Sequence, residues 1–153
     1  MLRIREKLQA IVEQINASGT PATFNYANAR QQNYDANSQP LKDTPTINVI
    51  QIESGVFSMT PATGSFKEKY PTVQLQFLKL SSHDYNSVQN DMIIDEMKEL
   101  AKKFLLRYEA SELFEPLKEV VFNQIYHYLD DDTAGIEITL PVIELDSQTV
   151  CLT

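Results

Sequence analysis

Three consecutive carboxylates, Asp130, Asp131 and Asp132, form the densest group of potential metal ligands in the chain. Hard divalent cations prefer several carboxylate oxygens, so this run is a candidate cation site. The calcium-loop pattern alternates its ligands around a central glycine and closes with a glutamate, whereas here the acids are consecutive and Thr133 and Ala134 follow. A charged hairpin tip explains the run better, and we expect no bound metal.

The two histidines, His83 and His127, are the candidates for a general base. A base of this kind needs a nucleophile and an orienting acid within hydrogen-bond reach. His83 lies in a polar linker, and His127 stands between two tyrosines in an expected strand, where a position on the sheet face is the simpler interpretation. No GxSxG, HExxH or CxxC motif occurs, and four glycines cannot form a phosphate-binding loop. We therefore expect neither an enzyme nor a cofactor.

The single cysteine, Cys151, excludes a disulfide or a thiolate cluster within one chain. Residues 1–17 carry charges among their apolar residues, which is not typical of a signal peptide. No stretch approaches the roughly 18 apolar residues that a membrane span requires. The sequence therefore predicts a protein kept in the cytoplasm without a membrane partner.

Charge is divided unevenly along the chain. Residues 1–110 carry 12 acidic and 12 basic side chains, whereas residues 111–153 carry 9 acidic residues and only Lys118 against them. This acidic end repels phosphate backbones, so we expect no specific binding of nucleic acid. Arg3, Arg5 and Lys7 are either a solvated face or a surface that meets the acidic end of a neighbouring copy, in a heterologous contact of the kind that closes into a ring.

Two amphipathic helices are predicted, at residues 2–17 and 88–108. The first has apolar residues at helical spacing and ends at a glycine and a proline. In the second, acids crowd the first turns and bases the last turns, which complements the helix dipole. A short helical turn is expected within residues 111–119, broken at Pro116.

Alternation of apolar and polar residues predicts strands at residues 22–27, 46–59, 72–80, 120–129 and 135–145. Gly55 is interpreted as a bulge in the second strand, and Pro141 as the mark of an edge strand or a bulge. Residues 28–45 read as a long polar loop and residues 60–70 as a hairpin tip. A loop as long as residues 28–45 often has a binding or assembly role, and a surface insertion without function is the equal alternative for it.

The resulting order is α-β-β-β-α-β-β in one domain, residues 1–153. The strands are arranged as hairpins, and there are too few helices to connect parallel strands. The fold class is therefore α+β, with a mostly antiparallel sheet of about five strands packed by two amphipathic helices.

Three short segments carry a resemblance to small prophage proteins of the tail module: Phe-Asn-Tyr-Ala at 24–27, Asn33-Tyr34-Asp35, and Pro-Thr-Ile-Asn-Val at 45–49. The order of elements resembles that of the tail-terminator and tail-completion (head-tail joining) families of bacteriophages. This resemblance implies a structural virion subunit that forms a homo-oligomeric ring with copies of itself and contacts other tail or head-tail proteins. It would lie in the host bacterial cytoplasm during assembly and then in the virion tail.

The candidate assembly contacts are the basic residues of the first helix and the charged or polar residues of the loops, namely Arg3, Arg5, Lys7, Asn33, Tyr34, Asp35, Lys67, Lys69, Asp130, Asp131 and Asp132. The acidic terminal hairpin would then line a channel through which DNA slides without sticking. The alternative interpretation is an acidic soluble binding module, such as an immunity or inhibitor protein. Such a module stays monomeric and binds one basic partner with strong salt dependence.

Overall fold

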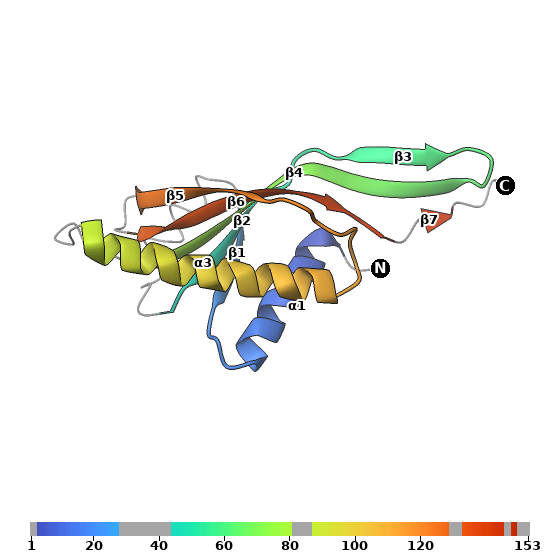
Figure 1. Ribbon diagram of the computed structural model, residues 1–153. Coiled ribbons are helices and arrows are strands. Elements are labelled where there is room, and N and C mark those ends of the chain that lie inside the picture. Colours follow the sequence, from blue (N-terminus) through green and yellow to red (C-terminus); the bar gives the residue numbers. More distant parts are fainter. Residues whose placement is uncertain (1–2, 28–43, 81–86, 129–132, 146–147, 150–153) are drawn as a thin grey trace.

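The computed structural model describes residues 3–27, 44–80, 87–128, 133–145 and 148–149 (Figure 1). These residues form an α+β fold of two helices and a mostly antiparallel sheet, which confirms the predicted fold class. The described part of the sheet has seven strands rather than about five. Its elements are α1 (Ile4–Ala17), β1 (Thr23–Ala27), β2 (Thr46–Ile50), β3 (Val56–Thr60), β4 (Ser65–Leu80), α3 (Ser87–Ala110), β5 (Val121–Tyr128), β6 (Thr133–Ile143) and β7 (Gln148–Thr149).

Strand β4 is the centre of the sheet and is 16 residues long. The main order is β1-β2-β4-β6-β5, in which β1 and β2 are parallel and the other neighbours are antiparallel. The second half of β4 lies between β2 and β6. Its first half extends beyond them and pairs with β3 and β7. Because one strand serves both groups, the sheet continues into a projection at one end of the molecule (Figure 1).

The single strand expected at residues 46–59 is wrong, because the chain leaves strand geometry between β2 and β3. Both strands nevertheless pair with β4, since Val49 lies opposite Leu75 and Val56 lies opposite Lys69. From Val49 to Val56 the chain advances by seven residues, whereas β4 advances by six between their partners Lys69 and Leu75. The break between β2 and β3 therefore holds one extra residue, as a bulge does. Gly55 is the last residue of this break.

The expected hairpin tip at residues 60–70 is also too long, because β3 ends at Thr60 and β4 begins at Ser65. Lys67 and Lys69 consequently lie in a strand. The expected helical turn within residues 111–119 is absent as well, and Phe114 instead forms a bridge to Glu144. Burial of the Phe114 ring, stacked 4.6 Å from the Tyr108 ring, outweighs helix formation in this short segment.

Strand β6 is an inner strand, but its pairing with β5 ends at Thr139, so among the described residues Pro141 has a paired strand, β4, on one side only. The interpretation of Pro141 as an edge or bulge position is therefore confirmed. The pairing of β4 with β6 shifts between Tyr70 and Val73, and Pro141 lies opposite this interval. Pro71 falls in the same interval. Neither proline can donate a backbone hydrogen bond, so the two share one irregular position between the central sheet and the projection.

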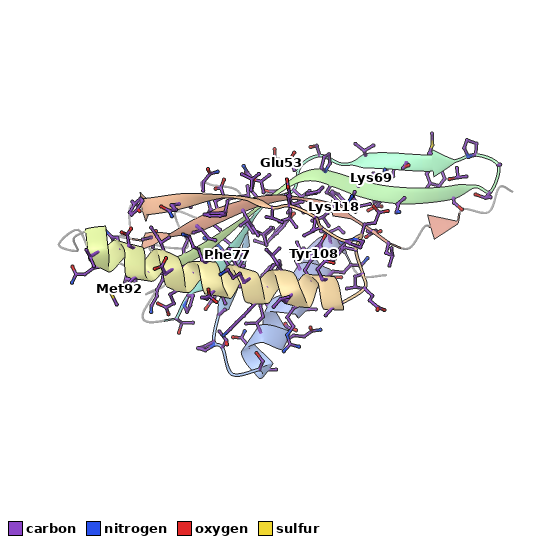
Figure 2. The ribbon with its side chains drawn as sticks, in the orientation of Figure 1. Glu53, Lys69, Phe77, Met92, Tyr108 and Lys118 are labelled. Carbon is purple, nitrogen blue, oxygen red and sulfur yellow. The ribbon has the colours of Figure 1, made fainter. Side chains whose placement is uncertain are left out.

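Both helices pack on one face of the sheet, and the hydrophobic core lies between the helices and this face (Figure 1). Figure 2 shows Phe77 and Tyr108 in this space, where Phe77 packs edge to face on Phe104 with ring centres 5.7 Å apart. The core residues of α1 are those that the sequence places on its apolar face: Leu8, Ile11, Val12 and Ile15. The other sheet face carries buried Asn48 and Gln76, and the Gln76 amide donates to the Glu137 carboxylate.

Candidate assembly surfaces

The projection seen in Figure 1 is a β-arm, which we define as β3 together with residues 65–70 of β4. On the other side of β4, β7 pairs with the tip of the β-arm and β6 with its base. Phe57 and Met59 lie on one of its faces, opposite Glu68 and Phe66 respectively. The exposed fractions are 68% for Phe57 and 61% for Met59. The Phe57 ring packs edge to face on the Phe66 ring at 6.4 Å, which forms an apolar cluster on this face beside Glu68. A solvated hairpin has little reason to carry such a surface, so the β-arm is suited to protein contact.

The base of the β-arm is fixed to the rest of the chain by polar contacts. Lys67 forms an ion pair with Glu115, which lies between α3 and β5. The backbone amide of Glu144 donates to the carbonyl of Glu68 at 3.2 Å. Lys69 lies opposite Val56 on one side and Ile143 on the other. Lys67, which was predicted as an assembly contact, therefore forms an ion pair within its own chain.

Tyr70 closes the β-arm at its base. Its hydroxyl donates to the Glu68 carboxylate. Burial, followed by this hydrogen bond, raises the pKa of Tyr70 well above its ordinary value, so the phenol stays protonated. A small pocket beside it is lined by Gly55, Val56 and Phe57 and by this tyrosine and glutamate. The phenol acts here as a hydrogen-bond donor that links two residues of the strand.

The three basic residues of the first helix have different roles. Lys7 forms a 2.9 Å ion pair with Glu144, and both side chains are largely buried. The guanidinium of Arg5 lies 5.8 Å from the centre of the Tyr26 ring. The backbone amide of Arg3, at the start of α1, donates to Glu6. The contact between the basic helix and the acidic end of the chain is thus made by Lys7 within one molecule, whereas Arg3 and Arg5 are both exposed.

Several predicted positions lie outside the described residues: Asn33, Tyr34, Asp35, Asp130, Asp131, Asp132 and His83. The side chain of His127 also lies outside the description. Among the residues that are described, no group of three or more histidine, cysteine, aspartate or glutamate side chains is arranged to hold a metal ion. No helix in the described ranges is both long and apolar enough to cross a membrane.

The apolar face of the β-arm was not predicted, because residues 60–70 were interpreted as a hairpin tip and only Lys67 and Lys69 were named there as contacts. The signal was present in the alternation of Phe57 and Met59 on one side of the turn and Phe66 on the other. Hydrophobic side chains at every second residue on both sides of a short turn are typical of a hairpin with one apolar face. In comparisons with protein-family models and curated protein sequences, this chain matches no family model and no curated sequence.

Proposed function

We propose that this protein is a structural assembly subunit, and that its β-arm packs on a neighbouring protein surface. The observation that carries the proposal is the apolar face of the β-arm, formed by Phe57, Met59 and Phe66, on a projection fixed at its base. A fixed projection loses little conformational entropy on binding, so more of the burial energy of its apolar face contributes to affinity.

The setting that we propose is the tail of a bacteriophage or prophage, as a tail-terminator or connector-like ring component. The support for this setting is the order of elements and the sequence segments that resemble those families. The β-arm gives such a subunit a means of making head-to-tail contacts, because an apolar projection on one copy and its receptor elsewhere on the next form a heterologous interface. Contacts of this kind generate closed rings when the rotation between copies closes.

The experiment compares the assembly state of the natural chain with that of the Phe57→Ser variant. About 68% of a phenylalanine side chain with an area of roughly 200 Å² is available for burial. At about 25 cal/mol per Å², its loss weakens each contact by up to about 3 kcal/mol, or about a hundredfold in Kd. Native mass spectrometry and negative-stain images should show oligomers that dissociate in the variant.

Met92→Ser is the matched control, because Met92 is 67% exposed on α3 and points away from the sheet (Figure 2). It removes a similar apolar area outside the β-arm and should leave assembly unchanged. Equal oligomers in the natural chain and Phe57→Ser would contradict the proposal. A strictly monomeric chain that binds a basic partner with strong salt dependence would instead favour the acidic binding module. The tail assignment is tested separately, by searching for this chain in purified virions by mass spectrometry.

A further inference from the structure

Strand β5 is the outer strand at one end of the described sheet, beside β6. Its eight residues, Val-Phe-Asn-Gln-Ile-Tyr-His-Tyr, include no charged residue and no proline. Outer strands usually carry such residues, because their free backbone groups otherwise accept another strand. Val121 is 68% exposed, Phe122 50% and Tyr126 46%. The pairing of β5 with β6 shifts between Ile125 and Tyr128, so β5 carries a bulge near its end and is regular from Val121 to Ile125. No strand among the described residues pairs with the outer side of this regular part, which is uncharged and suited to strand addition.

Helix α3 runs beside β5 in the opposite direction. The ammonium of Lys98 lies 5.3 Å from the centre of the Phe122 ring, near the start of β5. The Tyr126 hydroxyl, nearer the end of β5, donates to the Asp91 carboxylate at 3.0 Å, and this bond raises the pKa of Tyr126 and keeps it protonated. Helical spacing places four charges on this side of α3, with two acids followed by two bases: Asp91, Asp95, Lys98 and Lys102.

This division of charge selects one orientation for a second strand of the same kind. In a parallel pair of β5 strands the bases of one copy would face the bases of the other, and the acids would face the acids. In an antiparallel pair each basic end faces an acidic end. Because unlike charges attract and like charges placed together oppose association, the surface is complementary to itself only in the antiparallel arrangement.

We propose that β5 pairs antiparallel with β5 of a second copy of this chain, about a two-fold axis at Gln124. This register continues the sheet across both molecules and leaves the helices of both on the same face. The central pairs of this register, Asn123 with Ile125 and Gln124 with Gln124, fall in the regular part of β5. Phe122 lies opposite Tyr126 of the second copy, where the bulge begins, and aromatic pairs across strands stabilise a sheet. Lys98 of one copy lies near Asp91 of the other, twice in each dimer.

The dimensions of a sheet agree with this arrangement. Neighbouring strands are about 4.8 Å apart, so the two copies of β6 would be about 14 Å apart, with both β5 strands between them. Helix α3 packs on β6 and β4 and touches β5. Two helices about 10 Å wide whose axes are at least about 14 Å apart leave a gap of at least about 4 Å. Lys98 already extends from α3 over the Phe122 ring of β5, toward the second copy, which brings its ammonium within reach of a carboxylate across this gap.

This interface does not use the β-arm and does not depend on the virion assignment. A two-fold contact uses the same patch on both copies and closes at a dimer, whereas the contact proposed for the β-arm is heterologous. The two proposals therefore fail separately. Phe57→Ser should leave the β5 pair intact, and variants in β5 should leave the contacts of the β-arm intact.

Charge reversal tests the orientation. Sedimentation equilibrium of the full chain should show self-association that Lys98→Glu weakens by about tenfold or more, since each dimer loses two attractions and gains two repulsions. Adding Asp91→Lys to Lys98→Glu exchanges the two signs and should return Kd to within about threefold of the natural value. Lys103→Glu is the control, because Lys103 contacts Thr20 on another side of α3 and has the same change of charge.

Disulfide cross-linking tests the register in a Cys151→Ser background. Gln124→Cys should cross-link on oxidation, because the axis places the two copies of residue 124 opposite each other. Val121→Cys should not, because its two copies would lie about six residues, or roughly 20 Å, apart along the strands. Both positions are exposed, and circular dichroism checks that both variants fold.

Four results would overturn the inference: a natural chain that stays monomeric at every concentration, association unaffected by Lys98→Glu, an exchange of charges that restores nothing, or cross-linking at residue 121 instead of 124. A closed ring in which Gln124→Cys does not cross-link would also overturn it, while leaving the function proposed for the β-arm standing.

Discussion

Removal of the Glu144 charge by Glu144→Gln should destabilise the folded chain. Lys7 and Glu144 are 2.9 Å apart, with side chains 14% and 8% exposed. Loss of one partner from a fully buried pair costs about 3–5 kcal/mol, because the other charge stays desolvated. Since Lys7 retains some access to water, we expect a loss of about 2–3 kcal/mol in the free energy of unfolding, or roughly 5–10 °C in Tm for a chain of this size.

The assay is urea unfolding of the natural chain, Glu144→Gln, Lys7→Met and the double variant. The double variant should lose less than the sum of the two single variants, because it leaves no unpaired charge. The losses should also be the same at every protein concentration, since the pair lies within one molecule. A loss below about 0.5 kcal/mol in Glu144→Gln, or one that grows on dilution, would refute the intrachain role of Lys7.

Two further predictions concern the core. In Gly135→Ala the new Cβ would lie 1.8 Å from the carbonyl oxygen of Phe77, so β4 and β6 must separate locally, and we expect a loss of about 3 kcal/mol or more by urea unfolding. Gly19→Ala should lose about 1 kcal/mol, because φ is +97° there but no atom of the described residues lies within 4 Å of the new Cβ. Tyr108→Phe should raise the free energy of unfolding by about 1 kcal/mol, because the buried hydroxyl has no hydrogen-bond partner among the described residues. Burial raises the pKa of Tyr108, so the stability of the natural chain should fall as pH rises above about 10, where only the unfolded phenol ionises, and this fall should be smaller in the variant.

The sequence determined the helices and the fold class because those depend on patterns within short segments. The stripe of Leu8, Ile11, Val12 and Ile15 specifies the buried face of α1 without reference to any other element. The alternation in β4 and β6 likewise specifies which residues face the helices, since a strand has a period of two whatever its neighbour is. Pro141 was interpreted as an edge or bulge position from the sequence alone, because a proline cannot complete a ladder.

The pairing between distant segments was decided only by tertiary structure. Nothing near Lys7 in the sequence indicates that its partner is Glu144, 137 residues away, instead of an acid on another copy. The β-arm was likewise hidden, because residues 65–70 become a strand only through pairing with β3 and β6. The open edge of β5 is a property of strand order, and that order depends on which hydrophobic faces pack together. Local sequence fixes which residues are apolar, but the folded sheet decides which strand is left at its edge.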